Sequence, residues 1–161
     1  MEAFEKSILD WAMRYCYKLT VEFEFHVRSD QTVDINELAL GCSVPHGKLP
    51  FRFNRCELNC DVEGSALTTL ENVPLEVHGW FNCSHNYLRS LEFCPKFVQG
   101  DFDCSGNQIP LWEYRYLLFS EIHGEIRTPS SALDEFFKRY QNKKHLIPQA
   151  LKELRKLQNN R

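Results

Sequence analysis

The stretch FNCSHNYL at residues 81–88 returns as FDCSGNQI at residues 102–109, and this repetition decides the fold. The offset is 21 residues, and the same offset relates Leu70 to Leu91 and Leu91 to Trp112. Self-similarity at a fixed period is typical of proteins that stack one supersecondary unit on the next. The sequence therefore predicts layers of short strands in the middle of the chain.

An earlier, looser copy of the repeat begins at Leu58. In this alignment the step from Cys60 to Leu67 is two residues longer than in the later copies, and their Asn is missing. Because side chains alternate along a strand, the alignment predicts two buried and two outward columns. The buried columns are Leu58, Phe81 and Phe102, and Cys60, Cys83 and Cys104; the outward columns are Glu57, Trp80 and Asp101, and Asn59, Asn82 and Asp103.

The outward columns contain the candidate site, because Trp80 stands there among polar and acidic residues. A large aromatic side chain on a polar face is typical of a protein-recognition anchor. The alternative is that a neighbouring loop or a terminal helix covers Trp80. On the first interpretation the partner-binding residues are Glu57, Asn59, Trp80, Asn82, Asp101 and Asp103.

The two clear copies also share an asparagine, Asn86 in one and Asn107 in the other. Asn side chains bond readily to the nearby backbone in turns. We therefore expect both residues to satisfy backbone groups where the chain turns back.

The segment before the repeat predicts a helix followed by a hairpin. Residues 3–19 place apolar side chains at three- and four-residue spacings, as in an amphipathic helix. Apolar and polar residues alternate over 21–27, and a second alternating run begins at Val33, so 20–40 is predicted to be a β-hairpin. Residues 41–50 are predicted to be a connecting loop.

The segment after the repeat predicts two helices. Residues 111–126 fit a helix or a strand, and the pattern does not decide between them. Ser130 or Ser131 can cap a helix, and Pro148 fits the first turn of a last one.

The predicted fold class is α+β, with short stacked strands flanked by an N-terminal helix plus β-hairpin and by C-terminal helices. Two clear copies and one imperfect copy need other elements to seal their ends. We therefore expect a single domain over 1–161: a helix and hairpin cap at 1–50, a repeat region at 51–112 and a C-terminal helical region at 113–161.

The seven cysteines are interpreted as reduced thiols packed in the core. A zinc site made by the repeated cysteines with His78 or His85 is the alternative, but residues in one column lie a strand apart rather than around one point. Cys56 and Cys60 are spaced C-x-x-x-C, which is not the redox spacing. Phosphate-loop, dinucleotide, zinc-protease and hydrolase motifs are absent from the sequence, so we predict no enzyme, cofactor or metal.

Charge is divided unevenly along the 161 residues. The net charge is −3, but residues 134–161 carry +5 and residues 1–133 carry −8. The acidic charge of residues 1–133 argues against nucleic acid as a general partner. The basic end has two interpretations: it is a solvated helical face, or it is a surface that binds an acidic partner or a phosphate backbone. The apolar runs are too short to cross a membrane, and acids among the first residues argue against a signal peptide, so we expect a cytoplasmic location.

The unit aromatic-x-Cys-x-x-Asn-x-Leu resembles the short leucine-rich repeats common in tailed-phage proteins, over residues 58–112. The whole chain, with its first residues 1–6 and basic end, resembles the T-even phage inhibitors of the host Lon protease. That resemblance implies a protein that binds the ATP-dependent protease Lon in the host cytoplasm and blocks energy-dependent proteolysis, without an active site or cofactor of its own. The alternatives are an interaction module for another host target, and nucleic-acid binding through the basic end; a homo-oligomer stays open.

Overall fold

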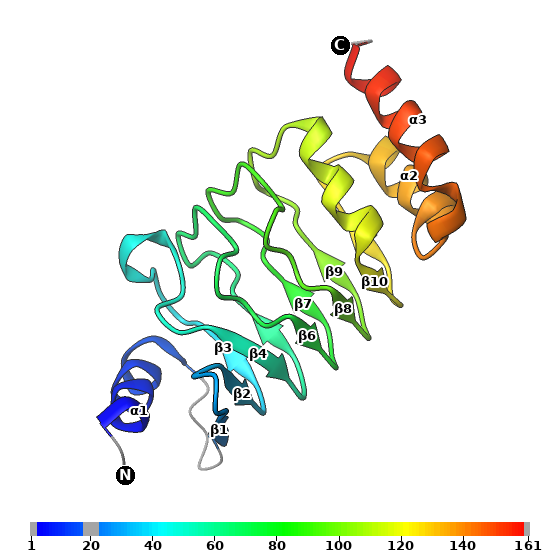
Figure 1. The fold of residues 1–161 in the computed structure, drawn as a ribbon. Helices are drawn as coiled ribbons and strands as arrows, with labels where there is room; N and C mark the ends of the chain where they lie inside the picture. The colour runs from blue at the N-terminus through cyan, green and yellow to red at the C-terminus, as the bar shows by residue number, and fades with distance from the viewer. Residues whose placement is uncertain (1–2, 18–22, 160–161) are drawn as a thin grey trace.

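The computed structural model describes residues 3–17 and 23–159, and it shows a row of stacked coils with helices at both ends (Figure 1). Helix α1 (Ala3–Tyr15) lies at one end, and α2 (Ser131–Tyr140) with α3 (Ile147–Asn159) lies at the other. Strands fill the row between them. This arrangement confirms the α+β class with terminal helices.

The described strands form two sheets, one of six strands and one of five. In spatial order the six-stranded sheet contains β1 (Phe25–Val27), β2 (Val33–Ile35), β4 (Phe53–Cys56), β6 (Glu76–Val77), β8 (Phe97–Val98) and β10 (Glu121–Ile122). The five-stranded sheet contains β11 (Ile126–Arg127), β9 (Phe102–Asp103), β7 (Phe81–Asn82), β5 (Cys60–Asp61) and β3 (Leu38–Ala39). Neighbouring strands are parallel except in the predicted hairpin, where β1 and β2 pair antiparallel, which confirms it.

Each repeat forms one coil that gives a strand to both sheets. A three-residue corner joins the two strands, as at 78–80 between β6 and β7. The backbones of successive coils approach closely there, since Gly100 N donates to Gly79 O at 2.8 Å. A Cβ atom on Gly100 would lie 3.0 Å from the Gly79 carbonyl oxygen and from the Trp80 nitrogen. Close backbone approach therefore favours glycine at position 100.

The predicted register of the first copy is wrong by two residues. Strand β5 pairs Cys60 with Phe81, as β7 pairs Phe81 with Phe102, so the 21-residue step continues without an insertion. Leu58 occupies the corner place that Gly79 holds in the next coil, and it is 54% exposed rather than buried. The alignment matched cysteine to cysteine, whereas a buried place accepts any apolar side chain of suitable size. The buried columns are Leu38, Cys60, Phe81, Phe102 and Ile126, and Val62, Cys83 and Cys104.

The two asparagines bind the backbone of the turns, as predicted. Asn86 Oδ1 accepts a hydrogen bond from Leu67 N at 2.9 Å, and Asn86 Nδ2 donates to Val62 O at 2.8 Å. Asn107 does the same one coil later, accepting from Leu88 N and donating to Cys83 O. Each asparagine thus joins its own coil to the preceding one.

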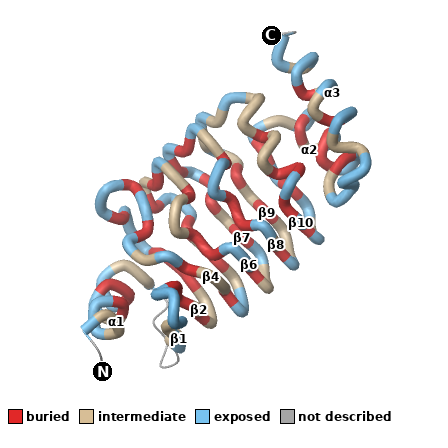
Figure 2. Tube along the Cα trace, in the orientation of Figure 1, coloured by how far each residue is buried: buried red, intermediate tan, exposed pale blue. Residues whose placement is uncertain are grey.

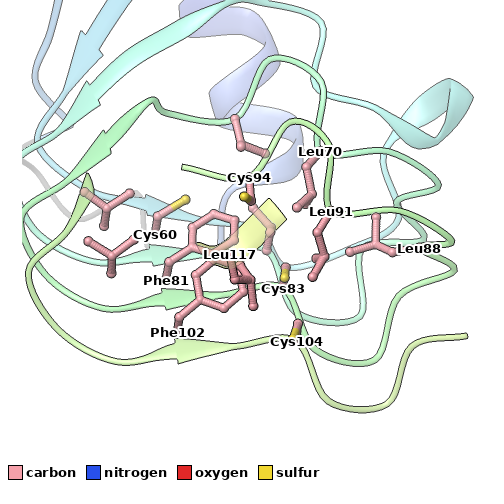
Figure 3. Close-up of a cluster of buried hydrophobic side chains, with 14 of the residues drawn as sticks. Cys60, Leu70, Phe81, Cys83, Leu88, Leu91, Cys94, Phe102, Cys104 and Leu117 are labelled. Carbon is pink, nitrogen blue, oxygen red and sulfur yellow. The ribbon is translucent and has the colours of Figure 1, made fainter. Parts of the chain in front are cut away.

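The core lies inside the coils, where the buried positions face one another (Figure 2). The rings of Phe81 and Phe102 stack with centroids 5.2 Å apart, and the sulfurs of Cys83 and Cys104 follow them along the strands (Figure 3). Five free thiols are buried: Cys56, Cys60, Cys83, Cys94 and Cys104. The interpretation of cysteines as core residues is confirmed for these five; Cys16 is half-buried and Cys42 is exposed.

The elements that precede the repeat are of the kinds that the sequence predicts. Helix α1 buries Ile8, Trp11 and Ala12; Leu19 and Val21, assigned to the predicted helix and hairpin, lie outside the described residues. The predicted loop at 41–50 includes a short 3-10 helix, η1 (Pro45–Gly47).

The undecided segment at 111–126 contains both kinds of element. It forms the 3-10 helix η2 (Leu111–Phe119), then β10, and it enters β11. Both predicted C-terminal helices are confirmed, with the 3-10 helix η3 (Lys144–Leu146) between them.

Candidate functional site

The candidate site is the outer face of the five-stranded sheet, which we call the Trp80 face. One of its columns contains Asn59, Trp80, Asp101 and Glu125, and the next contains Asp61, Asn82, Asp103 and Arg127. Side chains alternate along β7 and β9, so the residues beside buried Phe81 and Phe102 face outward. Four predicted residues therefore come together here: Trp80, Asn82, Asp101 and Asp103.

Two of the predicted residues stand elsewhere than expected, because the first copy is displaced by two residues. Asn59 lies on the face, but in the column of Trp80, and its Oδ1 accepts from Trp80 N at 3.1 Å. Glu57 belongs to the six-stranded side, where its nitrogen donates to Ile35 O and its carboxylate lies 2.7 Å from Arg55 Nε. Glu57 is thus not part of the face. Asp61 takes the place that sequence analysis gave to Asn59, and an unbroken 21-residue step back from Asn82 would have found it.

Trp80 borders a hollow of about 250 Å³. Asn82, Asp101, Asp103 and Arg127 line the same hollow. The Trp80 side chain is 37% exposed, so in the described part of the chain neither a loop nor a terminal helix covers it. Among the two interpretations of Trp80, the structure favours the exposed one.

Hydrogen bonds to the backbone hold the polar side chains of the face in place. Asn82 Oδ1 accepts from Ser84 N at 3.0 Å, and Asp103 Oδ1 accepts from Ser105 N at 2.9 Å. Asp101 Oδ1 accepts from Glu125 N at 3.0 Å, as Asn59 does from Trp80. A surface fixed in this way loses little conformational entropy when it binds a partner.

The Trp80 face is acidic. An ion pair on it joins Arg127 Nη2 to Asp101 Oδ2 at 2.9 Å. Against this guanidinium stand the carboxylates of Asp61, Glu63, Asp101, Asp103 and Glu125, with Glu63 accepting from the Asn82 amide at 3.1 Å. The face therefore complements a positively charged surface.

The buried thiols are poorly suited to nucleophilic chemistry. Burial raises the pKa of Cys60, Cys83 and Cys104 well above the usual thiol range, because a thiolate would lose its hydration. Cys60 lies in the phenylalanine column while Cys83 and Cys104 share the next one, so the predicted column of three cysteines does not form. Within residues 3–17 and 23–159 no three His, Cys, Asp or Glu side chains are grouped as a metal site would need.

The basic end is partly neutralised by its own neighbours. Lys138 pairs with Glu135 and Arg139 with Glu153, each at 2.9 Å. The Arg155 guanidinium lies over the Trp112 ring, 4.9 Å from its centroid. None of the helices in the described ranges is both long enough and apolar enough to span a membrane.

Comparison of the chain with protein-family models, with curated proteins and with solved structures finds no match in any of the three.

Proposed function

We propose that this chain is a protein-binding module that inhibits the host ATP-dependent protease Lon, with the Trp80 face as its contact surface. The observation that carries the proposal is Trp80, 37% exposed, beside a hollow on a face whose polar side chains are held by hydrogen bonds to the backbone. Exposed aromatic side chains next to a hollow are typical centres of binding energy in protein interfaces. The choice of Lon as the target rests on the whole-chain resemblance to the T-even phage inhibitor PinA.

We also propose that the coils are a short form of the leucine-rich repeat. Support comes from the 21-residue step, the parallel pairing in both sheets and the asparagines that join successive coils. Stacked repeats of this kind present extended surfaces that bind other proteins.

Inhibition by such a module requires only a difference in affinity between two states of the target. A ligand that binds one conformation of a cycling machine more tightly shifts its population toward that conformation. We therefore propose that the module impedes the ATP-coupled movement of Lon, and does not occupy its peptidase pocket. Degradation of a folded or long substrate would then stop, while cleavage of a short peptide that needs no translocation would continue.

The test uses purified Lon, ATP and the full chain at increasing concentration. ATP-dependent casein degradation and ATP-independent cleavage of a short fluorogenic peptide are measured in parallel. Loss of the first with retention of the second supports the proposal. Undiminished casein degradation at saturating inhibitor overturns it, and affinity capture from lysate with mass spectrometry then identifies the other host target that the alternative requires.

A second candidate function is nucleic-acid binding through the basic end. The observation that favours it is the exposure of Lys143, Lys144, Lys152 and Lys156 on or beside α3. Binding to a phosphate backbone would weaken steeply with salt. Retention on a DNA column that falls with salt, and is lost in the Lys143→Gln, Lys144→Gln double variant, would support this candidate over the first.

A further inference from the structure

The outer faces of both sheets carry carboxylates, but the groups that lie beside these carboxylates differ. On the six-stranded side, arginines pair with two of the carboxylates: Arg55 Nε lies 2.7 Å from Glu57, and Arg28 Nη1 lies 3.2 Å from Asp34. A second hollow, of about 350 Å³ beside Leu75 and Phe93, is bordered by charges of both signs. The Trp80 face combines carboxylates that outnumber Arg127 with a hollow that is bordered by a partly exposed tryptophan. Negative charge beside an aromatic ring suits a cationic side chain.

We propose, on the basis of the proposed function, that the Trp80 face binds a basic segment of the partner protein. A lysine or arginine side chain of that segment enters the hollow and lies over the Trp80 indole. The negative potential of an indole face attracts a cation, most strongly for tryptophan among the aromatic residues. The hollow of about 250 Å³ has the dimensions of one or two side chains, which fits a short segment crossing the face.

The carboxylates beside Trp80 are positioned to share this cation. Arg127 shows the geometry within the chain, since its guanidinium lies 2.9 Å from Asp101 Oδ2 at the edge of the same hollow. In the described residues the hydrogen bonds of Asp103 use Oδ1, from Ser105 N and Ser105 Oγ, and leave Oδ2 for a partner. An incoming guanidinium or ammonium group is thus met by an aromatic face and a carboxylate held in a fixed orientation.

The chain itself supplies neutral replacements for both aspartates. Asn59 makes the bond to the next coil that Asp101 makes, and Asn82 makes the turn bond that Asp103 makes. The substitutions Asp101→Asn and Asp103→Asn therefore preserve the backbone hydrogen bonds while removing two negative charges. The double variant therefore tests the effect of the negative charge while the backbone hydrogen bonds of the face are kept.

The test measures binding of a fluorescein-labelled peptide of alternating arginine and glycine to the full chain at low salt. A peptide with glutamate in place of arginine controls for non-specific attachment. We expect the D101N/D103N double variant to bind the basic peptide about tenfold more weakly, with a shallower dependence on salt. The Glu76→Gln, Glu121→Gln double variant, which removes two charges from the six-stranded side, is the matched control and should bind as the wild type does.

The outcomes distinguish this inference from the proposed function. Equal binding of the basic peptide by the wild type and the double variant overturns the inference, even if Lon is inhibited. If the wild type binds the basic peptide specifically but does not inhibit Lon, the result supports a basic segment as the ligand of the face and shows that this segment does not come from Lon. Salt-sensitive self-association of the wild type that disappears in the double variant would show that a second copy occupies the face, and would overturn the choice of a separate partner.

Discussion

Asn86 lies between two coils, with its Oδ1 2.9 Å from the Leu67 nitrogen of the preceding coil. Its Nδ2 also donates to three carbonyl oxygens, of Val62, Cys83 and Ser84. The side chain is 4% exposed, so water does not replace these bonds when they are lost. One buried amide therefore satisfies backbone groups on both sides of a coil boundary.

Replacing this amide should weaken the whole stack. We expect Asn86→Ala to lower the free energy of unfolding by about 3 kcal/mol, because buried backbone groups lose their partners. Denaturant unfolding followed by circular dichroism measures the change. The same substitution at Asn107, which is less buried, should cost less; an equal or smaller loss at Asn86 would contradict this account.

The corner between the sheets supplies a second prediction. Gly100→Ala should destabilise the fold by about 1–3 kcal/mol, since its Cβ atom would press on the backbone of the preceding coil. Leu58→Ala is the control, because Leu58 is exposed at the equivalent corner of the first coil. Thermal unfolding should show a clear loss for the first variant and little change for the second.

A third prediction concerns Ala66, whose φ of 59° lies in the left-handed region. An L-residue with a Cβ atom is strained there and glycine is not. Ala66→Gly should therefore raise the free energy of unfolding by about 0.5–1 kcal/mol despite the greater freedom of glycine in the unfolded chain. Ala39→Gly, in the buried strand β3 at the edge of the five-stranded sheet, should have the opposite sign. Chemical denaturation of both variants checks the pair.

The buried thiols predict a loss of stability in alkali. Burial raises the pKa of Cys56 to about 12 and that of Cys16 to about 11, from an ordinary value of 9.0. The unfolded chain therefore releases these protons first. Their contribution to stability is complete below pH 9 and declines as the pH rises from about 9 toward 11 and 12, with at most about 1.4 kcal/mol lost per pH unit for each thiol.

The measurement is the free energy of unfolding from pH 7 to pH 10 in variants of one buried column. Cys56→Ala should make the alkaline decline shallower, because one titrating group has been removed. Val77→Ala also leaves a cavity in this column but removes no titrating group, and it should keep the wild-type slope. Parallel declines for all three proteins would show that Cys56 plays no part.

The binding surface supplies the last prediction. Trp80→Ala should weaken binding to the target by about 2 kcal/mol or more, because it removes the aromatic side of the hollow. Tyr87→Ala is the control: Tyr87 is an aromatic residue that is 66% exposed outside the face. Surface plasmon resonance compares the two affinities, and unfolding curves confirm that both variants remain folded. Equal affinities would place the contact elsewhere.

The sequence predicts much of this fold because its signals are local. The similarity of residues 81–88 to residues 102–109, at an offset of 21 residues, predicts the stacking, and Asn86 and Asn107 predict the turns. The register of the first coil escaped prediction because Cys60 and Phe81 fill the same kind of buried place despite their different sizes. The register of the first coil depends on how the three-residue corner pairs β5 with β7, and a local sequence pattern does not show which residues of two strands pair.

The candidate site was predicted correctly where the two clear copies define it and wrongly where the first copy does. Trp80, Asn82, Asp101 and Asp103 come from the two well-matched copies, and they share one face. Glu57 was included and Asp61 was missed because the first copy was displaced by two residues. The part played by Arg127 depends on β11, which pairs with β9 after a longer connection and carries no recognisable copy of the repeat.

The uniform step between coils has an evolutionary and engineering consequence. Since each coil contacts chiefly its two neighbours, duplication of residues 75–95 would insert another layer without disturbing the terminal elements. The molecule would lengthen by about 4.8 Å per added layer, and a second tryptophan would join the first in its row. A scaffold of this kind can change the reach of its surface in fixed increments.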